Sequence, residues 1–453
     1  VAMEGAAYLT RGDVLRRAQD IIGIPLKDID KTGRLASGKG AIGTVIEENW
    51  FDYSPNSESE PDFPEAGVEL KVTPYVHGKG GIRAKERLVC NIINYMEEYD
   101  RTFHTSSFWH KCNTMLLMSY EHRDDVPKGD LSIDKAILFS FPEEDLRIIE
   151  HDWETIITKV RKGLAHEITE GDTLYLAACT KGANATSVRK QPFSDIPAKQ
   201  RAYSLKSSYM TQILQRYIFG MEENERIVKD WHVLARTSFE GYLIAKLSPY
   251  YGKTQEELMA SFGVTKKPKN INDILLGKML GIHGRIAQTD EFKKASIVPK
   301  TIRVRRDGTI KECMSFPPFD FIKLSQETEW ESSELYNYLA PTKFLFVIFQ
   351  ENEEGKLVFD RVRFWNIPSR DLDEVERVWR KTRDTIQRGV VLQETKQGVR
   401  NDLPKASESH VAHVRPHAKD GKDRAPLPDG RMMTKQCFWL NNSYIAEQLK
   451  RLN

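Results

Sequence analysis

Residues 59–74 read SEPDFPEAGVELKVTP. From Val68 onward, apolar and polar residues alternate, which predicts a half-buried β-strand. Side chains two positions apart share one face of a strand, so Glu69 and Lys71 are expected side by side. The prolines and the glycine before the strand predict a bend, which can bring Asp62 back toward Glu69.

Two carboxylates and a lysine at one strand end suit a magnesium site with a cation beside it. Magnesium prefers oxygen ligands, keeps several waters and polarises phosphoryl oxygens. The lysine can stabilise the developing negative charge or orient the attacking water. The pattern Asp62…Glu69-x-Lys71 is typical of restriction-endonuclease-like nucleases, although a solvated charge pair on a strand gives the same Glu-x-Lys. A helix expected at residues 42–51 carries Glu47 and Glu48, either of which could complete the metal shell; alternatively, both are solvated.

Length and composition describe a soluble globular protein. The 453 residues predict two domains, and 40% hydrophobic with 29% charged residues is ordinary for such a chain. The formal net charge of +2 is nearly neutral, so nucleic-acid binding must depend on local basic patches. Five scattered cysteines predict free thiols in a reducing cytoplasm. No membrane span and no signal peptide are expected.

A second polar segment, residues 175–209, mixes cations with tyrosine, asparagine and serine. Such residues suit contacts with the phosphates and base edges of nucleic acid, while an ordinary exposed loop is the alternative interpretation. The candidates in this segment include Lys181, Asn184, Tyr203 and Lys206.

The most informative internal feature is a repeat. A helix expected at residues 146–162 and the residues just before it are matched later in the chain at a constant offset. The strand expected at residues 114–120 is repeated as well. Pro142, Asp145, Leu146, Trp153 and Gly163 recur as Pro368, Asp371, Leu372, Trp379 and Gly389. The sequence therefore predicts two copies of one α/β unit, residues 1–225 and 226–453.

The two copies differ where chemistry is expected. Alignment places Thr301 opposite Glu69 and Arg303 opposite Lys71, and Lys294 falls about opposite Asp62. The second copy thus lacks the carboxylates that would hold a metal but keeps positive charge. This favours a DNA-binding or regulatory copy, with a purely structural copy as the alternative. Its basic residues are Lys300, Arg303, Arg305, Arg306, Arg415 and His417.

Four runs of residues in the first copy resemble the MutH mismatch-repair nicking endonucleases. The matching runs are Asp62 to Lys71, Thr105 to Lys111, Asp152 to Glu154 and Lys181 to Ala185. The tandem arrangement resembles the GATC-cutting type II restriction endonucleases, in which an active MutH-like domain precedes an inactive one. The resemblance implies an α/β fold with two restriction-endonuclease-like domains in tandem, each a mixed β-sheet flanked by helices.

The resemblance also implies roles for single residues of the first copy. Asp62 and Glu69 match the metal ligands, and Lys71 matches the catalytic lysine. Glu48 matches the family's helix glutamate, although its spacing from Gly43 is one residue longer than in the family and Glu47 stands next to it. The residues implied to be catalytic are Asp62, Glu69, Lys71, Glu48 and Lys111.

The same resemblance also implies which residues recognise the DNA sequence. Lys181 matches a base-contacting lysine, whereas the family's arginine two residues earlier is replaced by Cys179. The recognition tyrosine falls at Ser204, beside Tyr203. Both features return in the second copy, which is therefore implied to bind the same sequence without cutting it; the residues concerned are Arg415, His417 and Trp439.

These observations predict a magnesium-dependent endonuclease that cuts both strands of DNA at GATC. Water would attack in line, while Lys71, its pKa lowered by nearby metal, orients or deprotonates that water. Two chains are expected to meet on the palindromic site, and the second domain to bind a second copy of it. The alternatives are a partner-regulated repair nickase, a non-catalytic DNA-binding protein, and an RNA- or structure-directed nuclease.

Overall fold

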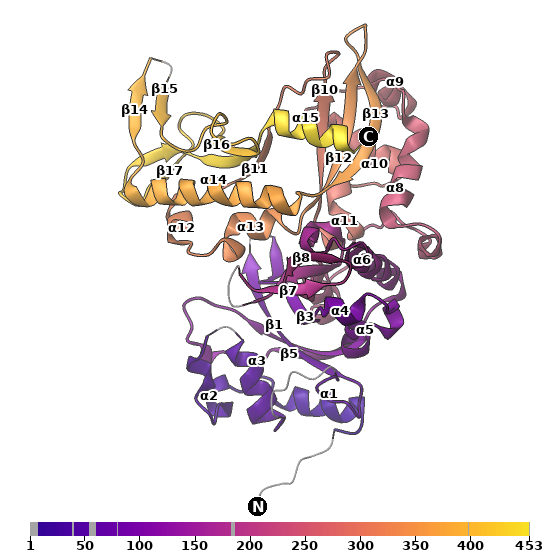
Figure 1. Cartoon of the computed structure of the whole chain (residues 1–453), viewed down its shortest axis with the longest axis vertical. Coiled ribbons are helices and arrows are strands. Elements are labelled where there is room, and N and C mark those ends of the chain that lie inside the picture. Colours follow the sequence, from indigo (N-terminus) through magenta and orange to yellow (C-terminus); the bar gives the residue numbers. More distant parts are fainter. Residues whose placement is uncertain are drawn as a thin grey trace, which may run out of the picture. The chain divides into compact units, whose positions relative to one another are not determined.

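The computed structural model describes residues 8–38, 40–53, 60–78, 80–182, 186–396 and 398–452. The chain forms two compact units, which are described separately here (Figure 1). Unit 1 contains Val1–Phe239 together with Ala287–Ile297, and unit 2 contains Glu240–Ile286 and Val298–Asn453. The segment Ala287–Ile297 thus returns to unit 1 after the chain has entered unit 2. The assignment of catalysis to residues 1–225 and of binding to 226–453 stays a prediction.

Unit 1 contains a mixed four-stranded sheet in the order β2-β1-β4-β5, in which β1 is parallel to β4 and antiparallel to β2. A second sheet has the order β3-β9-β6, and β7 and β8 form a hairpin. The strands are β1 (Glu69–Gly78), β2 (Gly81–Ala84), β3 (Leu88–Ile92), β4 (Thr114–Glu121), β5 (Lys135–Ser140), β6 (Leu176–Thr180), β7 (Val188–Gln191), β8 (Ser194–Lys199) and β9 (Arg201–Leu205).

Helices flank these sheets. The first three pack an apolar core, including Val14, Ile42 and Val45, against Leu70 and Leu116 of the mixed sheet (Figure 1). The helices of unit 1 are α1 (Arg11–Asp20), α2 (Leu26–Ile29), α3 (Ala41–Val45), α4 (Tyr95–Glu98), α5 (Ser107–Cys112), α6 (Glu143–Arg161), α7 (Ser207–Ile213) and α11 (Asp290–Ala295).

Unit 2 has a sheet in the order β10-β12-β13, a sheet in the order β11-β19-β16, and two hairpins, β14-β15 and β17-β18. The strands are β10 (Ile297–Val304), β11 (Met314–Pro318), β12 (Lys343–Glu351), β13 (Leu357–Trp365), β14 (Leu392–Thr395), β15 (Gly398–Asn401), β16 (Ala412–Pro416), β17 (Arg424–Pro426), β18 (Met432–Thr434) and β19 (Gln436–Leu440).

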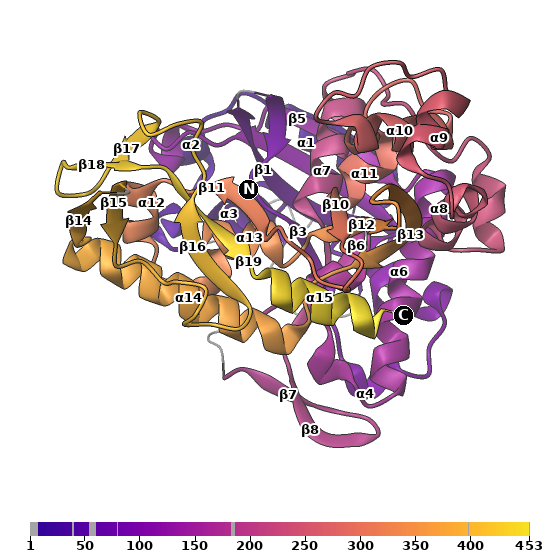
Figure 2. The same cartoon turned by 90° about the horizontal axis from the view of Figure 1, so that it is seen from above.

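The long helix α14 of unit 2 lies along the sheet that contains β16, as both views show (Figures 1 and 2). Among the described residues, no helix is long and apolar enough to cross a membrane. The helices of this unit are α8 (Phe239–Leu247), α9 (Gln255–Ser261), α10 (Ile271–Leu280), α12 (Phe321–Gln326), α13 (Glu334–Leu339), α14 (Ser369–Arg388) and α15 (Asn442–Arg451).

The predicted tandem fold is confirmed by a shared order of elements in the two units. The order β4-β5-α6-β6-β9-α7 recurs as β12-β13-α14-β16-β19-α15. The hydroxyl of Tyr209 donates to Asp145 at 3.1 Å, and the hydroxyl of Tyr444 donates to Asp371 at 2.7 Å. The repeated aspartate therefore anchors the start of the long helix in both copies, with its tyrosine partner supplied by the closing helix.

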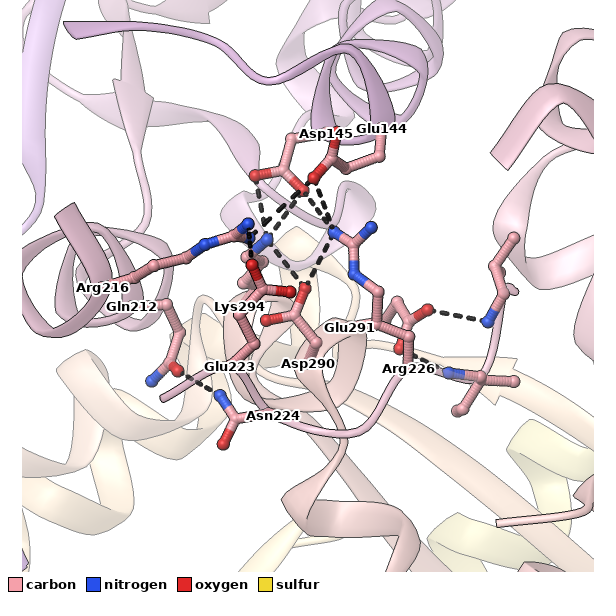
Figure 3. Close-up of polar contacts among 12 residues, drawn as sticks. Glu144, Asp145, Gln212, Arg216, Glu223, Asn224, Arg226, Asp290, Glu291 and Lys294 are labelled. Atoms are coloured by element: carbon pink, nitrogen blue, oxygen red, sulfur yellow. Dashed lines mark hydrogen bonds and ion pairs between the residues drawn. The ribbon is translucent and has the colours of Figure 1, made fainter. Parts of the chain in front are cut away.

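A buried ion cluster holds α11 within unit 1 (Figure 3). The Lys294 ammonium lies 2.8 Å from Asp145 Oδ1 and 2.7 Å from Asp290 Oδ2. Arg226 lies 3.2 Å from Asp290 Oδ2, so two cations face two carboxylates. The alignment placed Lys294 about opposite Asp62, but the structure places it on α11, where these acids neutralise its charge.

Candidate active site

The bend before β1 brings two carboxylates together, as the sequence predicted. Phe63 and Val68 form a β-bridge, and Gly67 between them adopts a positive φ of 61°, which glycine accepts without strain. The Asp62 amide donates to Glu69 Oε2 at 3.2 Å. The Leu70 amide donates to Asp62 Oδ2 at 2.9 Å. The main chain of the bend therefore orients both acids.

Two lysines neutralise Glu69, which is 2% exposed. The Lys71 ammonium lies 2.7 Å from Glu69 Oε1 and donates to the main-chain oxygen of Cys90 on β3 at 3.1 Å. Lys111 on α5 lies 3.8 Å from the same Glu69 oxygen. The three side chains come from β1 and α5, so strand and helix packing brings them together.

Burial and charge act against each other in this cluster. Burial raises the pKa of Glu69, an effect that Lys71 partly offsets. Burial by itself lowers the pKa of Lys71, but the Glu69 carboxylate and the neighbouring Cys112 and Cys90 together outweigh burial, and the pKa is raised. The protein groups thus favour the ammonium form of Lys71, and a lowered pKa would require positive charge beyond what they supply.

The helix glutamate beside this pair is Glu47. Helix α3 continues into a π-helical turn, Ile46–Trp50, which holds one more residue per turn than an α-helix. Burial and the charges of Asp62 and Glu69 raise the pKa of Glu47 to about 7. Glu48 instead pairs with Arg34 at 2.6 Å. The spacing from Gly43 had left the choice between Glu47 and Glu48 open in the sequence.

The carboxylates fit a magnesium ion by their chemistry. Asp62, Glu69 and Glu47 offer oxygen donors alone, and their mutual repulsion contributes to the raised pKa of Glu47. Within the described ranges, no three His, Cys, Asp or Glu side chains stand close enough to form a preformed cluster. Because magnesium is usually bound through one or two carboxylates and several waters, the Asp62 and Glu69 pair is sufficient for it.

Three predicted DNA contacts of unit 1 lie in its core. The Tyr203 hydroxyl donates to Glu98 at 3.1 Å, Ser204 Oγ donates to the Ala177 oxygen at 3.4 Å, and the Lys206 ammonium donates to the Thr173 oxygen at 2.6 Å. Strand β9 lies between β3 and β6, and every residue of it is buried. The structure therefore corrects the expectation of surface positions for Tyr203, Ser204 and Lys206.

Lys181 is placed differently. It follows β6 directly, its side chain is exposed, and its amide donates to the Gln200 oxygen at 2.8 Å. This anchors the main chain while leaving the ammonium at the surface. Asn184 lies outside the described residues.

The predicted contacts of unit 2 come together on β16 and β19. The exposed Arg415 guanidinium lies over the Trp439 ring at 4.5 Å, and the indole N–H donates to the Arg415 oxygen at 3.2 Å. The His417 ring lies 5.4 Å from the Trp439 ring. Strand register places Cys179 and Ser204 at the corresponding positions of unit 1, where both are buried. An exposed cation–aromatic cluster is thus present in the second copy at positions that are buried in the first.

Comparison with known proteins agrees with this architecture. The family profile "DNA mismatch repair enzyme MutH" matches residues 51–152, which include Asp62, Glu69, Lys71 and Lys111. The type II restriction enzyme Sau3AI of Staphylococcus aureus is 38% identical, over 98% of this chain and 99% of its own length. The chain belongs to the Sau3AI family.

Members of the MutH family match about half of the chain. The DNA mismatch repair proteins MutH of Shewanella woodyi and Escherichia coli are 29% and 28% identical over 47% and 46% of this chain, and over 94% and 93% of their own lengths. A MutH protein therefore corresponds to one of the two copies. This Sau3AI-family chain is a type II restriction endonuclease, a site-specific deoxyribonuclease that acts on DNA.

Proposed function

We propose that the chain cleaves both strands of DNA at GATC in a magnesium-dependent reaction. The observation that carries this proposal is the Asp62 and Glu69 carboxylate pair with Lys71 beside it on β1. GATC specificity is supported by the resemblance of Lys181, and of Arg415 with Trp439, to the readout residues of MutH-like enzymes.

Each residue of the site has a defined task in this proposal. Asp62 and Glu69 would hold magnesium, and Glu47, in place of Glu48, would be the third carboxylate beside the metal. Magnesium supplies polarisation of a phosphoryl oxygen and a more acidic bound water. Lys71, held between Glu69 and the Cys90 oxygen, presents a donor to the attacking water or to the scissile phosphate. Lys111 adds a second positive charge that attracts the DNA backbone.

Cleavage of both strands then requires two active units. The second copy has Thr301 and Arg303 where the alignment expects Glu69 and Lys71, so each chain offers one acidic pair for cutting. We infer that two chains meet on DNA and that unit 2 binds a second GATC site through Arg415, His417 and Trp439. Binding of a second site raises the local concentration of chains at the first.

Plasmids with one and two GATC sites test this mechanism. With magnesium, the two-site plasmid should be linearised faster, and chelation of the metal should stop cleavage of both. A plasmid without GATC is the control. Equal rates on one and two sites would contradict second-site binding, and an accumulation of nicked circles alone would favour a repair-type nickase.

A further inference from the structure

In each unit a lysine of the first long strand donates to a main-chain oxygen of a strand in another sheet. In unit 1, Lys71 reaches from β1 to the Cys90 oxygen on β3 at 3.1 Å. In unit 2, Lys300 reaches from β10 to the Ser315 oxygen on β11, also at 3.1 Å. The alignment expected Arg303 opposite Lys71, but in the structure Lys300 makes the main-chain contact, to an oxygen one residue before the position that matches Cys90.

The surroundings of the two lysines differ in one respect. Lys71 has the Glu69 carboxylate at 2.7 Å, whereas within the part of the chain that the structure describes Lys300 has no carboxylate partner. Burial lowers the pKa of Lys300. An ammonium group carries three donors, and the Ser315 oxygen uses one. A half-buried cation without an anion is costly, and such groups concentrate at functional sites.

A hollow of about 150 Å³ lies beside this ammonium. It is formed by β10, the segment before β11 and one residue of α15. The exposed Arg303 side chain has no ion-pair partner among the described residues. The lining offers two cations, two hydroxyl groups and one carboxylate; it includes Lys300, Thr301, Arg303, Glu312, Ser315 and Ile445.

The hollow adjoins the cluster of Arg415, His417 and Trp439. Ser315, which accepts from Lys300, pairs directly with Trp439 across β11 and β19. Cys437, two residues before Trp439, is close to both the Lys300 ammonium and the His417 ring. The hollow and the cluster are therefore neighbours across the pairing of β11 with β19.

We propose that this hollow binds one backbone phosphate of the DNA duplex held by unit 2. The inference rests on the proposed DNA-binding role of unit 2 and specifies its chemistry. Lys300 and Arg303 neutralise the phosphate, and the hydroxyl groups of Thr301 and Ser315 supply neutral donors. Unit 2 thus holds a phosphate beside β10, the strand that the alignment matches to β1 of unit 1.

Cys313 provides a direct test because it lines the hollow and is partly exposed, whereas the other four cysteines are buried. The full chain with Glu69→Gln, a variant expected to bind with little cutting, is treated with iodoacetamide, and alkylation of Cys313 is followed by mass spectrometry. A GATC duplex should slow this alkylation in proportion to its occupancy. Binding of the duplex with an unchanged alkylation rate would overturn the phosphate site alone, while absence of binding would overturn the proposed function as well.

A substitution gives the second test. In the same background, Lys300→Met should weaken duplex binding by about tenfold and lower the slope of log Kobs against log salt by about 1, as expected for one lost phosphate contact. Lys323→Met, on the exposed face of α12, is the matched control and should change neither value. Lys300→Met should also unfold at an equal or higher urea concentration than the parent. A lower urea midpoint with unchanged DNA affinity would show that Lys300 is structural.

Discussion

The Lys71 ammonium lies 2.7 Å from the Glu69 carboxylate, and the two side chains come from the same face of β1. Both groups are withdrawn from water, so each is the main neutralising partner of the other. The Cys90 oxygen and Lys111 complete their surroundings. The charge balance at the end of β1 therefore depends on both members of the pair.

Glu69→Gln should abolish most of the cleavage while keeping the fold. The amide retains the shape of the side chain but cannot supply the charge, and we expect single-turnover cleavage to fall by at least about 100-fold. Glu65→Gln removes a nearby exposed carboxylate and is the matched control. Both variants are compared on supercoiled plasmid with magnesium. Full activity of the Glu69→Gln variant would contradict the assignment of Glu69 to the active site.

Glu47→Gln and Glu48→Gln separate the two candidates on the helix. Because Glu47 lies toward Asp62 and Glu69, its loss should raise the magnesium concentration for half-maximal cleavage by about tenfold. Glu48 pairs with Arg34, so Glu48→Gln should leave this value nearly unchanged. The measurement is a magnesium titration of the cleavage rate. A larger effect at Glu48 would restore the assignment made from the sequence.

Lys294→Met should destabilise unit 1. It leaves Asp145 and Asp290 without their shared buried cation, and breaking such a pair costs about 3–5 kcal/mol of unfolding free energy. The double variant Asp145→Asn with Lys294→Met should recover part of this loss. Lys293→Met, which loses one hydrogen bond to Asn224, is the control. Urea unfolding measures all three, and equal midpoints for Lys293→Met and Lys294→Met would contradict a role for the buried cluster.

Arg415→Ala should remove the advantage of a second GATC site. The planar guanidinium both stacks on Trp439 and offers a two-pronged donor, so Arg415→Lys should restore little. The expected result is that two-site plasmids are cut at the rate of one-site plasmids, with the one-site rate unchanged. Arg400→Ala, an exposed arginine of β15, is the control. A persistent two-site advantage in Arg415→Ala would place second-site binding elsewhere.

Local patterns predicted much of the fold. The alternation from Val68 predicted β1, the strand expected at residues 114–120 is β4, and the helix expected at 146–162 is α6 (Glu143–Arg161). The repeated aspartate and tryptophan predicted two similar units, and the structure gives both aspartates the same tyrosine partner. The strand and helix patterns depend on neighbours within one element, and such neighbours are visible in a sequence.

The sequence by itself determined the acidic bend, its lysine and the duplication, because period and spacing set which side chains share a face. Tertiary structure decided which helix glutamate turns inward, because Glu47 lies near Asp62 and Glu69 whereas Glu48 pairs with Arg34. It also buried Tyr203 and Lys206, since β9 is covered by strands and helices distant in the chain. Among the described residues it gave Lys300 no carboxylate partner for the same reason: burial and pairing depend on what packs against a strand, which its own residues do not encode.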